Sequence, residues 1–214
     1  RYKQRRNPGE QDIYMTQIQG DGTWSLPKKL SDKINTPGIE ESVQIHPDGQ
    51  TLYFSSDGHP GMGGLDIYLS RLDEKGEWSK PENLGYPINT FKEENSTLVS
   101  SSGEFAYFAS NRDGGEGSLD LYSFVIPESK RPIKTTFMKG KVYDIETKKP
   151  LAADFQLIDL KTGIMFKRAV ANRGNGEFIV ALPINKDFAL IAEHDGYFFY
   201  SENYSIDKLV KNED

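Results

Sequence analysis

The sequence of 214 residues contains no cysteine. This absence excludes disulfides, thiol catalysis and thiolate metal sites, although a domain with a sufficient core needs no disulfide in any compartment. No apolar run approaches the roughly 20 residues of a membrane span, and no apolar segment follows the basic N-terminal residues, so we expect neither a transmembrane segment nor a signal peptide. The net charge of −6 argues against a nucleic-acid partner, which needs clustered Lys and Arg.

Catalytic and cofactor motifs are also missing. The three histidines, His46, His59 and His194, show no metal-ligand spacing. The sequence has no Gly-x-Ser-x-Gly elbow and no phosphate-binding loop of the Gly-x-x-x-x-Gly-Lys type. Its glycine-rich stretches link two expected strands, so they have no helix dipole to hold a phosphate. We therefore expect a protein without catalytic activity and without a cofactor.

Turn-forming residues and aromatic residues are abundant instead. The 20 glycines and 11 prolines indicate many turns and few long helices, and the 12% aromatic content can support a packed core. The composition therefore favours an all-β protein.

A repeat with a period of 54 residues runs through the first part of the chain. Asp-Ile-Tyr or Asp-Leu-Tyr recurs at Asp12, Asp66 and Asp120, and Trp-Ser-x-Pro recurs at Trp24 and Trp78. A constant spacing without insertions predicts a repeated structural unit. The residues that we expect to be structurally equivalent are Asp12, Asp66 and Asp120; Tyr14, Tyr68 and Tyr122; Trp24 and Trp78; Tyr53 and Tyr107; and Phe54 and Phe108.

Each unit reads as four short antiparallel strands, expected at residues 42–45, 51–55, 65–72 and 77–81. This pattern predicts a β-propeller blade, whose repeated aromatic residues pack against the neighbouring blades. Residues 1–125 hold too few units to close a ring of about 4–8 blades, so we expect an incomplete ring from a larger protein. The acidic excess also lies in this part, which favours a basic or polar partner.

Two sets of repeat residues have alternative roles. Each repeated Asp is expected to accept hydrogen bonds from loop backbone, whereas the alternative is a calcium site formed by Asp57, Asp66, Asp113 and Asp120. The tryptophans are expected in the core between blades, and the alternative is a sugar- or peptide-binding surface.

Past residue 125 the repeat stops. Residues 126–136 resemble a linker, with two prolines and mixed charge. Residues 137–206 alternate apolar and polar positions in six or seven short segments, which predicts a small β-sandwich. Residues 207–214 form a charged tail.

Two stretches resemble known modules. "HPDGQTLYFSSDG" followed by "GGLDIYLS" resembles the TolB-type, WD40-like propeller repeat. The residues that resemble the carboxypeptidase-regulatory-like domain are Gly140–Asp144, Thr147, Pro150-Leu151, Gly176–Phe178, Leu182-Pro183 and Gly196-Tyr197. In this order the two modules resemble the middle region of Bacteroidota OmpA-family envelope proteins, including the PorE-like group associated with type IX secretion. The resemblance implies a lipoprotein at the periplasmic side of the outer membrane, with peptidoglycan bound through a domain that this chain does not contain.

The leading hypothesis is thus a non-catalytic scaffold or protein-interaction module of the cell envelope, with envelope or secretion-system proteins as partners. The alternative hypothesis is a carbohydrate-active or glycan-binding propeller protein, suggested by the Asp-rich loops.

Overall fold

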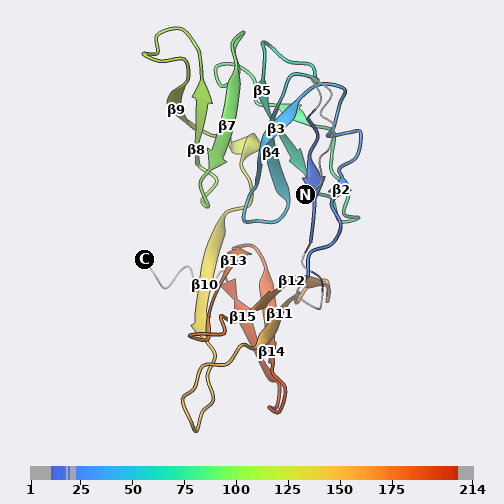
Figure 1. Ribbon diagram of the computed structural model, residues 1–214, viewed down its shortest axis with the longest axis vertical. Coiled ribbons are helices and arrows are strands. Elements are labelled where there is room, and N and C mark those ends of the chain that lie inside the picture. The colour runs from blue at the N-terminus through green and yellow to red at the C-terminus, as the bar shows by residue number, and fades with distance from the viewer. Residues whose placement is uncertain (1–10, 18, 20–22, 207–214) are drawn as a thin grey trace. The chain divides into compact units, whose positions relative to one another are not determined.

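The computed structural model describes residues 11–17, 19 and 23–206, and the expected tail at 207–214 lies outside them (Figure 1). The chain is all-β and is built from several small antiparallel sheets. It divides into two compact units, with the boundary between Pro132 and Ile133. Within the described ranges, no helix has the length and apolar character to cross a membrane.

The first unit contains three sheets, in the orders β1-β2, β3-β4-β5-β6 and β7-β8-β9. Its elements are β1 (Tyr14–Met15), β2 (Lys28–Lys29), β3 (Glu40–Ile45), β4 (Thr51–Ser56), β5 (Asp66–Arg71), β6 (Glu82–Asn83), β7 (Glu94–Val99), β8 (Phe105–Ser110), β9 (Asp120–Val125) and the 3-10 turn η1 (Glu128–Lys130).

The sequence repeat is also a repeat of structure. Strands β7, β8 and β9 begin and end 54 residues after β3, β4 and β5. Both sheets carry the same irregularity in their first strand, where Ser42 and Ser96 have φ of 52° and 55° at a break in register. Positive φ is uncommon outside glycine, and a bulge bends the strand, so the two sheets share even their local distortion.

Each face of the first four-stranded sheet is covered. Successive strand residues point to opposite faces, so the neighbours Tyr53 and Phe54 enter different cores. Tyr53 packs with residues of the next sheet, including Phe108, whereas Phe54 packs with Ile13 and Ile34, which flank the β1-β2 hairpin. In this sheet, Tyr53 and Phe54 therefore lie in the two contact layers on its opposite faces.

The fourth strand differs from its prediction. Residues 77–81 do not form a ladder; the strand is β6, and Trp78 makes only an isolated bridge to Leu72. The reason is that the Ser79 side chain takes the place of a ladder partner, because its Oγ accepts a hydrogen bond from the Arg71 N–H at 3.0 Å.

The segment expected as a linker is largely structured. Ile126 is fully buried in the core between the two repeated sheets, η1 follows it, and the Lys130 carbonyl accepts a hydrogen bond from Tyr53 Oη at 3.1 Å. Residues 126–132 thus belong to the first unit, and residues 135–136 already belong to the next strand.

The second unit contains two antiparallel sheets, β10-β13 and β12-β11-β14-β15. Their strands are β10 (Thr135–Lys141), β11 (Asp154–Asp159), β12 (Met165–Val170), β13 (Glu177–Pro183), β14 (Asp187–Glu193) and β15 (Tyr200–Ser205). Both sheets contribute to one core, with Val180 and Leu182 from one and Phe155, Leu157 and Phe188 from the other. The last strand begins at Tyr200, not at Gly196 as predicted, because residues 194–199 form a loop.

Candidate functional site

Two of the repeated aspartates, Asp66 and Asp120, occupy equivalent places, whereas the Asp12 carboxylate forms an ion pair with Lys29 at 2.7 Å. Asp66 and Asp120 are the first residues of β5 and β9, and each pairs with the last residue of the preceding strand. Asp66 Oδ2 accepts a hydrogen bond from the Met62 N–H, and Asp120 Oδ2 accepts one from the Gly117 N–H at 3.2 Å. Both carboxylates therefore hold the loop that precedes their strand, which is the role expected of an Asp in a turn.

The residue after each aspartate is held by a buried asparagine. Asn35 accepts a hydrogen bond from the Ile13 N–H at 2.7 Å and donates to the Ile13 carbonyl at 3.1 Å. Asn89 makes the same pair of bonds with Ile67, at 2.8 and 2.9 Å. Because an amide side chain both donates and accepts, it replaces a missing strand partner. Asp12 and Asp66 are thus followed by the same arrangement, one repeat apart.

A buried glutamate opens each repeated sheet, and the sequence analysis did not single it out. Glu40 and Glu94 are the first residues of β3 and β7, and both carboxylates are buried. Each accepts hydrogen bonds from two hydroxyl groups and one backbone N–H, with donors from Thr36 and Ser56 for Glu40 and from Thr90 and Ser110 for Glu94. Their 54-residue spacing was the available signal. Hydrogen bonding of this density offsets the burial of a carboxylate.

The glycine-rich loops anchor themselves on aromatic pairs. In the first repeat the Phe54 and Tyr68 rings stack at 5.9 Å, the His59 ring lies 5.8 and 5.3 Å from them, and His59 Nε2 lies 2.8 Å from the Ile34 carbonyl. His59 is therefore part of the contact between loop and core.

The second repeat makes the same contact with a different residue. Arg112 lies over the rings of Phe108 and Tyr122, at 4.7 and 4.9 Å. Its Nη2 donates to the Ile88 carbonyl at 2.6 Å, and Ile88 is the repeat equivalent of Ile34. The loop sequence changes, but the carbonyl that it contacts does not.

The four calcium candidates are not brought together. Asp57 Oδ1 accepts a hydrogen bond from the Ile39 N–H at 2.7 Å, and Asp113 pairs with Lys92 at 2.9 Å. Asp66 and Asp120 each bind loop backbone, as described above. Across residues 11–17, 19 and 23–206, no three His, Asp or Glu side chains gather in a way that could hold a metal ion.

The two tryptophans have different surroundings. Trp78 is 8% exposed and belongs to the core that contains Phe54 and Tyr68, whereas Trp24 is 64% exposed. Tyr107 is likewise 47% exposed, although its equivalent Tyr53 is fully buried. Equivalent residues thus differ in burial at the two ends of the repeat array.

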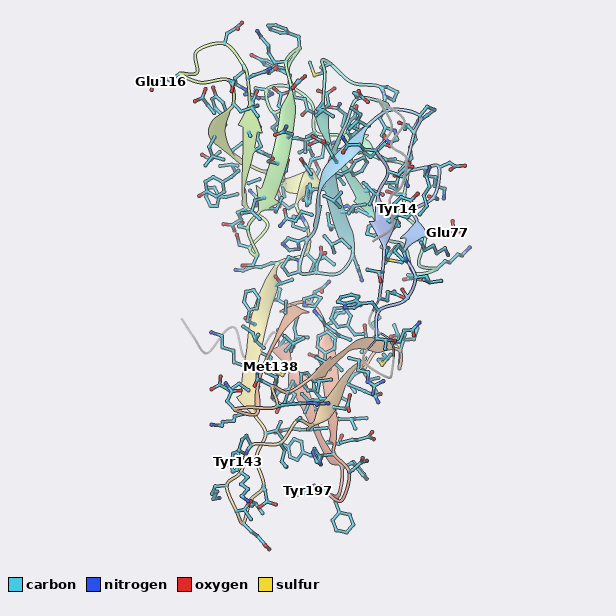
Figure 2. The ribbon with its side chains drawn as sticks, viewed as in Figure 1. Tyr14, Glu77, Glu116, Met138, Tyr143 and Tyr197 are labelled. Carbon is cyan, nitrogen blue, oxygen red and sulfur yellow. The ribbon has the colours of Figure 1, made fainter. Side chains whose placement is uncertain are left out.

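One end of the second unit carries a cluster of exposed aromatic residues, which we call the aromatic tip: Tyr143, Tyr197, Phe198 and Phe199. Figure 2 shows Tyr143 and Tyr197 at the same end of this unit. Tyr197 Oη donates to Asp144 Oδ2 at 2.6 Å, which ties the two loops together. This hydrogen bond lowers the pKa of Asp144 from its ordinary value and raises the pKa of Tyr197.

Beside the aromatic tip lies an open depression of about 500 Å³. Its wall includes Phe198, Phe199, Glu193 and an ion pair between Arg168 and Asp154 at 3.0 Å. Aromatic faces next to paired hydrogen-bonding groups suit a polar ligand with an apolar face, such as a sugar ring. Sequence analysis marked Gly196-Tyr197 only as part of a module resemblance.

No protein-family model matches the chain, and no curated protein sequence matches it.

Proposed function

We propose that the first unit is a segment of a β-propeller. The β3–β6 and β7–β9 sheets are consecutive blades, and the β1-β2 hairpin is the outer part of the blade before them. The observation that carries this proposal is the 54-residue equivalence of two sheets that pack face to face, down to their bulges and buried Asn and Glu residues. Stacked four-stranded sheets that shelter each other are the principle of a propeller.

We further propose that the second unit is a small β-sandwich of the carboxypeptidase-regulatory-like type. Its support is the single core shared by the β10-β13 pair and the four-stranded sheet. Together with the order of the two modules in the sequence, this supports a middle region of an OmpA-family envelope protein, located in the periplasm at the outer membrane.

The function that follows is a non-catalytic scaffold that presents loops to other envelope or secretion-system proteins. The repeated polar residues support it, because Asp66, Asn89 and Glu94 are engaged in holding their own backbone or neighbouring side chains. Rigid stacks that display variable loops commonly bind proteins.

A crosslinking pull-down from the envelope fraction of a Bacteroidota cell tests this role. The expected result is recovery of an outer-membrane or secretion-system protein with the intact chain. A chain with the loop of the second repeat replaced, residues 111–118, is the matched comparison. Recovery of only cytoplasmic proteins, or of the same set with an unrelated β-protein, refutes the envelope role.

A second candidate function is glycan binding, and the aromatic tip with its neighbouring depression favours it. The expected result of a glycan array is binding that Phe198→Ala and Phe199→Ala weaken. The control is Phe91→Ala, an exposed phenylalanine of the first unit. Absence of binding across the array rejects this candidate.

A further inference from the structure

The second repeated sheet has one apolar face that the described part of the chain leaves uncovered. We call it the front face, and its members are Leu98, Phe105, Tyr107, Leu121 and Val125. Cross-strand partners point to the same side of a sheet, and Leu98 pairs with Tyr107 while Phe105 pairs with Val125. All five side chains are between 47% and 74% exposed. A contiguous apolar surface of this kind marks an interaction site.

The preceding repeat shows what this side of a sheet is made to contact. Tyr53 and Ile67 are the equivalents of Tyr107 and Leu121, and both are 0% exposed. They are covered by the opposite face of the following sheet, through residues that include Val99 and Phe108. Two residues of the front face, Tyr107 and Leu121, thus repeat positions that the following sheet covers in the preceding repeat.

Equivalent glycines in the two glycine-rich loops also differ in how closely a neighbouring sheet approaches them. A Cβ on Gly63 would lie 2.4 Å from the Lys92 carbonyl oxygen, because the backbone entering the next sheet passes close by. A Cβ on the equivalent Gly117 meets nothing closer than 3.7 Å. Gly117 therefore has room for a neighbouring backbone that the described residues do not provide.

The other end of the array exposes the complementary surface. Tyr14 and Trp24 are exposed on the β1-β2 hairpin, and we call them the rear face. Their equivalents Tyr68 and Trp78 are buried in one core with Ile13 of the preceding hairpin.

The two hairpins match in detail. Thr16 Oγ1 donates to the Ser25 carbonyl at 2.8 Å, as Ser70 Oγ donates to the Ser79 carbonyl at 2.7 Å. The rear face therefore presents its aromatic residues on the same framework as the buried pair one repeat later.

We propose that the front face of one chain binds the rear face of a second copy of the chain. Leu121 of one copy packs against Tyr14 and Trp24 of the other, as Ile13 packs with Tyr68 and Trp78 within one chain. The interface continues an interface that the protein already contains. Because its two sides are different surfaces, the association is head-to-tail, and it produces rings or chains of copies and not a symmetric pair. The proposal rests on the stacked repeats of the proposed function and not on its envelope role.

The test uses two single variants of the full chain, Leu121→Glu on the front face and Trp24→Glu on the rear face. Both side chains are mostly exposed, so neither change disturbs a core; circular dichroism checks the fold. In sedimentation equilibrium, we expect the average mass of the unmodified protein to rise with concentration above the 24.2 kDa of one chain. In a solution of one variant, every copy has the same face altered, so no copy offers an intact partner for the unaltered face of another. We therefore expect each variant alone to remain a single chain.

Mixing the variants is the decisive experiment. Leu121→Glu retains an intact rear face and Trp24→Glu retains an intact front face, so the mixture is expected to form one pair, at twice the mass of one chain, and to stop there. The control is Ile164→Glu, an exposed apolar residue of the second unit, which should associate like the unmodified protein.

Four outcomes overturn the proposal. They are a single-chain mass for the unmodified protein at every concentration, self-association of either variant, failure of the mixture to pair, and loss of association in the control. Failure here leaves the pull-down test of the envelope role unaffected, and an unsuccessful pull-down leaves this test unaffected.

Discussion

Replacing Tyr53 and Tyr107 by alanine compares two equivalent positions with different surroundings. Tyr53 is fully buried between two sheets and its Oη donates to the Lys130 carbonyl at 3.1 Å. Removing a buried aromatic ring costs about 3–5 kcal/mol, and a lost hydrogen bond adds about 1 kcal/mol. Tyr107 is 47% exposed, so its replacement should change the free energy of unfolding by no more than about 1 kcal/mol.

Urea unfolding followed by tryptophan fluorescence measures this difference. Both tryptophans lie in the first unit, so the signal reports on that unit alone. With a slope of about 2 kcal/mol/M, a loss of 4 kcal/mol lowers the midpoint by about 2 M. The measurement is made on dilute protein, so that contacts between copies do not protect Tyr107. Equal midpoints for the two variants would refute the idea that neighbouring sheets, and not the residue type, decide stability at this position.

Three further predictions follow from the loops. Gly63→Ala should destabilise the first unit, because its Cβ would lie 2.4 Å from a backbone carbonyl, whereas Gly117→Ala should be tolerated; similar melting temperatures for the two would contradict the close approach. Tyr197→Phe should raise the pKa of Asp144 towards its ordinary value of 3.8, and carboxyl NMR titration would detect an unchanged pKa as a failure. Burial raises the pKa of Asp66 above its ordinary value of 3.8, so the folded protein loses stability as pH rises from 3.8 through that raised pKa. The stability of Asp66→Asn relative to the unmodified protein should therefore increase over that rise in pH, and urea midpoints that keep a constant difference would argue against this.

The repeat could be predicted because single residues with strong local preferences recur at a constant spacing. Asp66 and Asp120 begin strands after loops, and Phe54 and Phe108 alternate with their neighbours, so both the period and the faces can be read from the sequence. The bounds of β4 follow the run of β-branched and aromatic residues closely.

The sequence could not predict how neighbouring sheets change the burial of equivalent residues in different repeats. Trp24 and Trp78 share the Trp-Ser-x-Pro motif, yet one is exposed and the other is in a core, because burial at this position depends on whether another sheet precedes it. The two prolines and mixed charge of residues 126–136 predict a linker, and only the stacked sheets show that Ile126 completes a core. The aromatic tip escaped notice for the same reason, because it depends on two loops that meet in space.

The glycine-rich loops contain both residues that anchor the loop to the fold and residues that differ between the repeats. His59 and Arg112 come from different positions in their repeats, yet each contacts the equivalent carbonyl of the preceding connection and the equivalent aromatic pair. Such replacement is possible because the anchoring point is backbone, which any suitable donor can reach. The buried Asn and Glu residues make the same hydrogen bonds in both repeats, whereas the loop residues between these anchors differ. Under the proposed scaffold role, we expect specificity to lie in the non-equivalent loop residues, such as Met62 and Glu116, and not in the residues that recur.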